Sequence, residues 1–369
     1  MKKIVNWLNE STYIAPLSPA CRMCAQGSKM VVLVTGLCSA KCFYCPLSAK
    51  KKQKDRIFAN EWELTDEKDI KKLIQESKYI EAKGAGITGG DPLVVWKRTK
   101  KYISILKENF GSDFNIHLYT CGTINGDKVD ELVLAGLDEI RYHPEPNYWV
   151  NMNKSPMIPS IKKALETEAD VALEIPVIPG FEKEILSLIN WADRIGIKWV
   201  NLNELEFSET NAKELIKKNY TVKDDISSAV KGSQESAKNI IDIISKKDLK
   251  MGVHYCSSSF KDGIQLRNRI KRRAKNVVKK YEIITKDGTL LKGIIFSKNI
   301  PLDKIYSVLI KQFNVKPNDI SKNNNKNIIE IAPWILEEIS DKLKKEGFEC
   351  FIVEVYPTAD ALEVERIPL

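Results

Sequence analysis

The chain has 369 residues, which is enough for a full-sized catalytic domain with a smaller appended one. Its apolar fraction of 43% is ordinary for a soluble globular protein, and no apolar run is long enough to span a bilayer. The N-terminal residues MKKIVNWLNESTYIAP are too polar for the core of a signal peptide, so we expect a cytoplasmic protein without a membrane partner. The net charge of +9 is compatible with nucleic-acid binding and does not require it.

Histidine is scarce and cysteine is clustered. The three histidines, His117, His143 and His254, make a mechanism built on several histidines improbable on composition. Five of the eight cysteines fall between residues 21 and 45. In a reducing cytosol, clustered cysteines indicate metal binding rather than a disulfide framework.

The first two thirds of the chain alternate between strand and helix patterns. After an irregular N-terminal stretch, the predicted strands are 29–36, 85–90, 115–122, 138–144, 170–180, 198–207 and 249–256. The predicted helices are 66–80, 94–110, 126–135, 156–168, 182–196 and 222–246. This alternation predicts an α/β fold with parallel strands, forming a partial or full β/α barrel whose chemistry lies at the carboxyl ends of the strands.

The last third of the chain does not continue the alternation of strands and helices. Residues 261–280 are predicted as a basic connecting helix, and Asp287-Gly288 marks a hairpin between two apolar runs. A helix at 302–313, a polar loop at 321–327, a helix at 333–346 and further strands follow. We therefore expect four parts: an extension at 1–28 with a Cys-x2-Cys pair, a core at 29–260, the connector at 261–280 and a small α+β domain at 281–369.

Residues 38–46 read CSAKCFYCP, so Cys38, Cys42 and Cys45 follow a Cys-x3-Cys-x2-Cys spacing directly after the first core strand. Thiolates are the usual ligands of iron–sulfur clusters, commonly four per cubane. Three thiolates in one loop can hold three of the four irons and leave the last with an open position. Such a position distinguishes a reactive metal centre from a structural one. The alternative is a zinc knuckle completed by a fourth ligand from elsewhere.

This segment resembles the signature of the radical S-adenosylmethionine superfamily. The resemblance covers roughly residues 30–256, and within the superfamily the chain resembles archaeal-type proteins related to pyruvate formate-lyase-activating enzyme. It implies a 4Fe–4S cluster whose open iron is chelated by S-adenosylmethionine. Transfer of one electron then gives methionine and a 5′-deoxyadenosyl radical that abstracts hydrogen from a substrate. The resemblance also implies a barrel of the radical S-adenosylmethionine type and a ferredoxin- or flavodoxin-like electron donor.

Further matches sit at the ends of later predicted strands. Gly89, Gly90 and Asp91 resemble the Gly-Gly-Glu motif that contacts the methionine amino group, with Asp91 in place of the usual Glu. In the segment 119–122, Cys121 is a departure from the Thr-Asn-Gly-like stretch of related enzymes. The resemblance implies that Tyr44 packs beside the cluster. It also implies two further cofactor-binding residues: His143 at the mouth of the barrel, and Asn203 near the ribose or adenine.

A second metal site is a separate hypothesis. Cys21 and Cys24 form a Cys-x2-Cys pair, and His254 and Cys256 end the last core strand. These residue types suit a zinc site, and an auxiliary iron–sulfur cluster is the alternative. Unconnected residues with a packing role for Cys256 remain the third interpretation.

Three functions remain open at this stage. The first is a radical enzyme acting on a protein or peptide, such as an activase that installs a glycyl radical. The second is a radical enzyme that modifies tRNA, for which the basic runs at 50–56 and 267–280 are the only support. The third is a non-catalytic zinc- or iron–sulfur-binding protein.

Overall fold

The computed structural model describes residues 2–224 and 227–369, and it divides into two compact units, Met1–Leu266 and Arg267–Leu369. The segment predicted as a basic connector is therefore divided between them. A π-helix at Lys261–Leu266 belongs to the first unit, and α10 (Arg267–Val277) belongs to the second. In the described part of the chain, no helix is long and apolar enough to cross a membrane.

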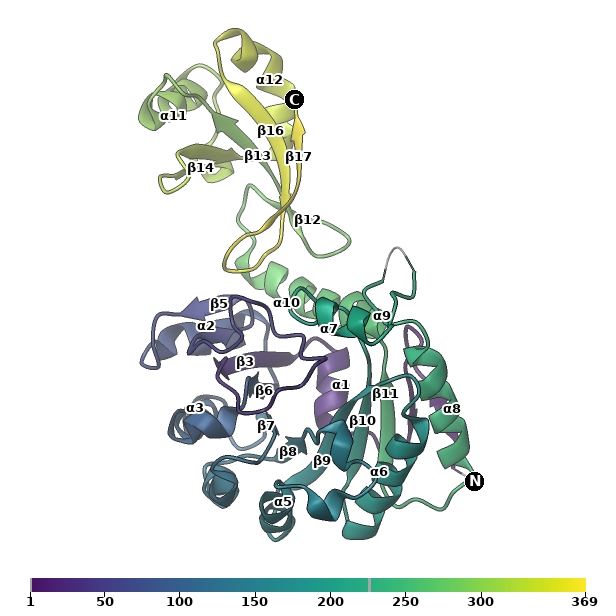
Figure 1. Ribbon diagram of the computed structural model, residues 1–369. Helices are drawn as coiled ribbons and strands as arrows, with labels where there is room; N and C mark the ends of the chain where they lie inside the picture. Colours follow the sequence, from purple (N-terminus) through teal and green to yellow (C-terminus); the bar gives the residue numbers. More distant parts are fainter. Residues whose placement is uncertain (1, 225–226) are drawn as a thin grey trace. The chain divides into compact units, whose positions relative to one another are not determined.

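The first unit is built on one sheet of parallel strands with antiparallel hairpins at both edges (Figure 1). The order is β1-β2-β11-β10-β9-β8-β7-β6-β3-β4-β5, and the strands from β11 to β3 are parallel to their neighbours. β3 and β11 do not pair, so the sheet is a partial barrel. The strands are β1 (Ile4–Asn6), β2 (Thr12–Ile14), β3 (Lys29–Thr35), β4 (Ile57–Ala59), β5 (Trp62–Leu64), β6 (Gly84–Gly89), β7 (Asn115–Thr120), β8 (Glu139–Tyr142), β9 (Asp170–Val177), β10 (Trp199–Glu204) and β11 (Gly252–Cys256).

Helices cover the outer face of this sheet, where the apolar residues of successive strands form one continuous core. They are α2 (Ile70–Tyr79), α3 (Trp96–Phe110), α4 (Val129–Leu134), α5 (Ile158–Leu165), α6 (Glu182–Ile195) and α8 (Ser233–Ser245), with α7 (Ala212–Lys217) and α9 (Ser258–Phe260) in the loops after β10 and β11. Because successive side chains of a strand point to opposite faces, the other residues of each strand face inward. The predicted α/β fold with a mostly parallel sheet is confirmed.

The N-terminal residues are more ordered than the sequence suggested. The stretch expected to be irregular forms β1, β2 and α1 (Pro19–Ala25). α1 packs against β3, β6 and β7 on the inner side of the sheet. Proline at the first helical position and Ser18, whose hydroxyl accepts from the Ala20 amide at 3.1 Å, start this short helix.

Two other predicted elements were wrong in extent. The helix expected at 222–246 begins only at Ser233, because Gly232 has φ +89° and Val222 pairs with Val230 as an antiparallel bridge. Residues 225 and 226 of that prediction lie outside the described residues. The predicted loop at 321–327 begins as β14 (Ile320–Asn323), which pairs with the neighbouring strand β15 (Ile328–Ile331).

The second unit is an antiparallel sheet with helices, as predicted for a small α+β domain. Its strand order is β14-β15-β13-β16-β17, and β12 pairs with β13 around the Asp287-Gly288 turn. The remaining elements are β12 (Ile283–Ile284), β13 (Leu290–Phe296), α11 (Leu302–Lys311), α12 (Pro333–Lys345), β16 (Glu349–Val355) and β17 (Glu363–Pro368).

One buried carboxylate in the second unit accepts hydrogen bonds from residues on other segments of the unit. Glu330 on β15 accepts from Lys292 Nζ at 2.7 Å and from the Tyr281 hydroxyl at 2.6 Å. Burial opposes ionisation of Glu330, but the charge and hydrogen bond of Lys292 outweigh it and lower the pKa to about 2. Because the folded pKa lies below the ordinary 4.5, the stabilisation is complete above pH 4.5 and is lost as the pH falls toward 2.

In the variant Glu330→Gln, the free energy of unfolding of this unit should therefore fall less as the pH is lowered. We expect it to remove up to about 3 kcal/mol at pH 7 and almost nothing near pH 2. Hydrogen exchange of peptides covering β13 and β15, measured from pH 7 to pH 3, reports this. Glu349→Gln, at an exposed position, is the control. An unchanged pH slope in Glu330→Gln would contradict the assignment.

Candidate functional site

The three-cysteine loop leaves the carboxyl end of β3, where it lies beside the end of β6. Two backbone hydrogen bonds join these segments: Gly90 N donates to Thr35 O and Asp91 N to Leu37 O, each at 2.8 Å. The glycines are required by this close approach. A Cβ at Gly89 would lie 2.0 Å from Thr35 O, and one at Gly90 would lie 2.2 Å from Leu37 O. The structure thus brings the two predicted motifs side by side.

The loop that follows the cysteines folds back over the same strand end. Gln53 donates its side-chain amide to Cys38 O at 2.9 Å, and Gly36 N donates to Lys54 O at 2.8 Å. Asp55 accepts from the Thr35 hydroxyl at 2.8 Å and from Arg98 on α3 at 2.6 Å. Part of the basic run at 50–56 therefore serves to fix the cysteine loop.

The far end of the motif is held from across the sheet by residues after β10. Asn211 is almost fully buried, and its Nδ2 donates to Tyr44 O at 3.0 Å and to Glu206 O at 2.9 Å. The Thr210 hydroxyl donates to Leu47 O at 2.8 Å and lies 3.1 Å from Cys45 O. Sequence reasoning did not find Thr210 and Asn211, because the spacing of residues gives no sign of a contact more than 160 positions away.

The thiols of Cys38, Cys42 and Cys45 are partly exposed and distributed around this loop. Among the described residues, no three His, Cys, Asp or Glu side chains lie close enough to hold one metal ion. A mononuclear zinc site needs its thiolates about 2.3 Å from a single point, whereas in a cubane each thiolate binds a different iron. Three partly exposed thiols in one loop could each bind a different iron of one cluster.

Tyr44 and His143 meet beside the cysteines. The Tyr44 hydroxyl lies 3.0 Å from His143 Nε2, and the ring centroids are 5.5 Å apart. Burial raises the pKa of Tyr44 and lowers that of His143, so both are neutral at neutral pH. The pair bridges β3 and β8 at the mouth of the partial barrel, where both residues were expected.

Asp91 caps the turn after β6 rather than pointing to solvent. It is fully buried, and its Oδ1 accepts from the Thr120 hydroxyl at 2.6 Å and from Leu93 N at 3.1 Å. Burial raises the pKa of this carboxyl, against the lowering by the Thr120 hydroxyl and the backbone amides of Leu93 and Cys121. Its Oδ2 is buried without a hydrogen-bond partner among the described residues. Such an atom is costly unless a ligand satisfies it.

Asn203 lies in a polar network on the inner side of the sheet. Its Nδ2 donates to Glu174 Oε1 at 2.8 Å, and Arg141 donates to Glu174 Oε2 at 2.8 Å. Burial would raise the pKa of Glu174, but Arg141 and the amides of Asn203 and Asn201 bring it below its ordinary value. Asn203 is therefore engaged within the protein in this structure.

The four residues of the hypothetical second metal site also line the inner side. The Cys21 thiol lies 3.5 Å from Arg141 Nη2, and Gln265 Nε2 donates to Cys256 Sγ at 3.5 Å. The His254 ring packs against Trp7, with centroids 5.6 Å apart, and both its nitrogens lack partners in the described residues. Cys24 lies on α1 with Cys21. These residues do not form a ready-made site for one ion, and the second metal site stays a prediction.

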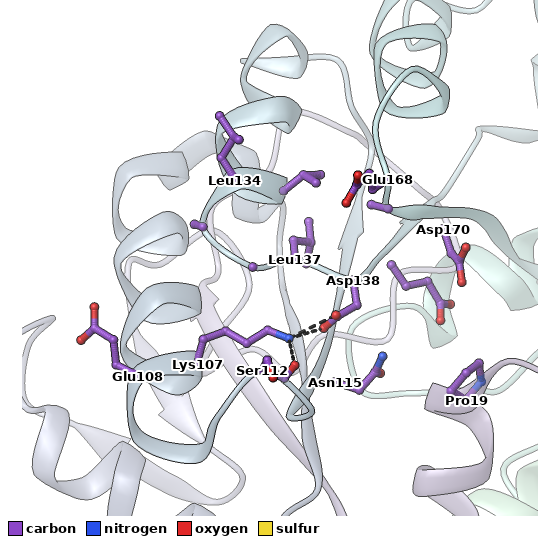
Figure 2. Close-up of a pocket in the computed structure, with 15 residues that line it drawn as sticks. Pro19, Lys107, Glu108, Ser112, Asn115, Leu134, Leu137, Asp138, Glu168 and Asp170 are labelled. Carbon is purple, nitrogen blue, oxygen red and sulfur yellow. Dashed lines mark hydrogen bonds and ion pairs between the residues drawn. The ribbon is translucent and has the colours of Figure 1, made fainter.

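The large pocket in Figure 2 lies at the opposite end of the strands. It has a volume of about 840 Å³ and is lined at the amino ends of β7, β8 and β9 by Asn115, Asp138, Glu139 and Asp170. Lys107 reaches into it and is bound by Asp138 at 2.9 Å. Because chemistry in such folds takes place at the carboxyl ends of the strands, this pocket is not the candidate site.

Comparison with known proteins places this geometry in a family. Residues 32–192 match the model of the radical SAM superfamily, and residues 288–369 match a domain of unknown function, DUF8061. A protein of Methanocaldococcus jannaschii named "Putative glycyl-radical enzyme activating enzyme" is 41% identical over 382 aligned positions, which cover 100% of this chain and 96% of the relative. The chain belongs to the radical S-adenosylmethionine superfamily, and it is an enzyme.

Two solved structures of low similarity align with part of the chain. SuiB of Streptococcus suis bound to S-adenosylmethionine is 10% identical, with a TM-score of 0.44, covering 62% of this chain and 50% of that one. Methylornithine synthase is 12% identical, with a TM-score of 0.40, covering 65% of this chain and 68% of that one. The chain thus spans about half the length of the first of these structures.

The contacts of Asn211 lead to a prediction for the cysteine loop. Asn211→Ala removes the hydrogen bond to Tyr44 O, which fixes the backbone before Cys45, and two that hold the loop of Asn211 itself, to Glu206 O and from Ser208 N, each worth about 1 kcal/mol. We expect a less constrained loop, measured as lower iron content after anaerobic reconstitution and faster loss of absorbance in air. Asn109→Ala, at an exposed position on α3, is the control. Equal iron retention in both variants would show that the loop does not depend on Asn211.

Proposed function

We propose that this enzyme is a glycyl-radical-activase-like radical S-adenosylmethionine enzyme that acts on a protein or peptide. The observation that carries the proposal is the relative named as an activating enzyme, which aligns over the full length of the chain. A redox protein that delivers one electron is the second partner that this activity requires.

A 4Fe–4S cluster would be held by Cys38, Cys42 and Cys45. The methionine end of S-adenosylmethionine would lie against Gly89, Gly90 and Asp91. The bound cluster and cofactor supply reductive cleavage of the sulfonium and a radical that abstracts hydrogen. The residues of this chain contribute position and shielding. The β6 glycines let the cofactor approach the backbone, and the Asp91 Oδ2 offers a buried acceptor to an N–H group of the methionine amine.

The neutral Tyr44–His143 pair closes one side of the mouth, and the Glu174–Asn203 network lies beneath it on the inner side. An adenosyl group placed between the cysteine loop and β10 would lie near both. We assign His143 and Asn203 to this cofactor region, with the Asn203 amide able to exchange its Glu174 contact for a ribose hydroxyl. Such an enclosed position limits access of water to the radical.

Cofactor cleavage gives the direct test. Reconstituted protein with dithionite and S-adenosylmethionine should yield 5′-deoxyadenosine and methionine in equal amounts. Cys42→Ser should reduce this yield to background because one iron loses its thiolate, whereas Cys350→Ser, in the core of the second unit, should retain it. Cleavage that survives in Cys42→Ser contradicts the assignment of the cluster ligands.

Substrate class requires a separate readout. Candidate proteins or peptides deuterated at glycine Cα should transfer deuterium into 5′-deoxyadenosine. Transfer from tRNA, with none from any protein, would replace this proposal with the tRNA-modifying function. Two basic residues of α10 are already engaged within the second unit, since Arg267 pairs with Asp287 and Arg273 donates to Pro357 O.

A further inference from the structure

A basic loop lies directly beside the cysteine motif. Two backbone hydrogen bonds return this loop to the end of β3: Gln53 N donates to Gly36 O and Gly36 N donates to Lys54 O, each at 2.8 Å. Asp55 is the one carboxylate between residues 38 and 56. The cationic residues of the same segment are Lys41, Lys50, Lys51, Lys52, Lys54 and Arg56.

Three of these lysines take no part in fixing the loop. The contacts that hold it come from main-chain groups and from the two polar side chains described above. Lys41, Lys50 and Lys54 are exposed, and none of them forms an ion pair with another residue that the structure describes. The carboxylate of Asp55 does not neutralise them, because it is bound by Arg98 at 2.6 Å. Positive charge therefore remains uncompensated beside the motif.

Helix α7 adds a further cation on the other side of the motif. The residues before this helix, Thr210 and Asn211, are hydrogen-bonded to main-chain carbonyls of residues 44–47. Lys218, at the end of α7, is exposed, and its Nζ lies 4.7 Å from the centroid of the Phe43 ring. Since Phe43 directly follows Cys42, this ammonium group lies next to the motif as well.

A cluster bound at this site must receive one electron from outside the protein. The three motif thiols are partly exposed, so a cluster bound to them would lie close to the surface. Because the rate of electron transfer falls steeply with distance, an electron carrier has to dock against the segments that surround the motif. These segments present lysines, so a carrier with a negatively charged surface fits them.

We propose that Lys41, Lys50, Lys54 and Lys218 form a docking surface for a small acidic protein that carries one electron. The inference rests on the proposed function, since it presumes a cluster on the three motif cysteines. In the docked complex the reduced carrier loses one electron and the cluster gains it, while no bond forms or breaks and no proton moves. Attraction between opposite charges speeds the encounter and orients the carrier toward the motif.

Nucleic acid also binds lysine-rich surfaces, but the aromatic residues of this loop favour a protein partner. Single-stranded RNA is held largely by stacking of its bases on aromatic rings. Tyr44 is buried, and Phe43 is half-buried with the ammonium group of Lys218 over its ring. The surface therefore offers positive charge without a free stacking platform.

The test uses the full-length reconstituted enzyme, with an acidic ferredoxin as the probe. The variant Lys50→Gln/Lys54→Gln/Lys218→Gln removes three charges from the proposed surface. The control removes three from exposed positions on α3, α5 and α6: Lys101→Gln, Lys162→Gln and Lys183→Gln. In anaerobic titration calorimetry at low ionic strength, we expect a several-fold higher dissociation constant in the first variant only. Equal dissociation constants in the two variants overturn the proposal.

Cofactor cleavage gives a second readout. The yield of 5′-deoxyadenosine with reduced ferredoxin, divided by the yield with dithionite, should fall several-fold in the first variant and not in the control. Dithionite is a small reductant that needs no docking surface. A loss of tRNA binding in the first variant, with ferredoxin binding unchanged, overturns the proposal in favour of RNA.

The wild type alone keeps the proposal falsifiable where a variant fails to fold. Its dissociation constant for ferredoxin should rise as the salt concentration increases from about 0.05 M to about 0.5 M, because salt screens exposed charges. A dissociation constant that does not change with salt contradicts docking on lysines. Absence of 5′-deoxyadenosine with dithionite in the wild type instead refutes the proposed function, so the two failures are distinguishable.

Discussion

The site depends on the backbone contact between the end of β3 and the end of β6. Two amide hydrogen bonds, Gly90 N to Thr35 O and Asp91 N to Leu37 O, hold the start of the cysteine loop against the Gly-Gly-Asp turn. They form only because neither glycine carries a Cβ, which would lie within about 2 Å of a carbonyl oxygen. The parallel pairing of β3 and β6 sets the register of the two strands. The glycines then allow the cysteine loop and the Gly-Gly-Asp turn to lie in contact at the strand ends.

The same contact explains what the sequence could and could not predict. Cys38, Cys42, Cys45 and the Gly-Gly-Asp turn were recognisable because each is a local pattern at the end of a predicted strand. Tyr44 belongs to the same cysteine motif, and His143 followed from the expectation that parallel strands end at one edge. The contacts of Thr210 and Asn211 with the cysteine loop could not be predicted, because they depend on loop conformations and on residues far apart in the chain.

The inner side of the sheet shows a similar limit. Sequence reasoning treated residues 1–28 as an extension, yet α1 supplies Ser18 and Cys21 to a buried network with Glu139, Arg141 and Asn201. Polar residues at alternate positions of buried strands were visible in the sequence. What they would contact was not, because α1 is short and has no strong helical pattern. The N-terminal segment is therefore part of the catalytic unit.

That network constrains how the enzyme can hold its cofactor. A guanidinium buried between two carboxylates is costly to disturb, since removal of one partner leaves an uncompensated charge. The Arg141, Glu139 and Glu174 side chains of this network are thus fixed by their pairing with one another. The Asp91 Oδ2 and the partly exposed motif thiols lie instead at the carboxyl ends of β3 and β6. A ligand can therefore bind at these strand ends without breaking the buried ion pairs of the inner side.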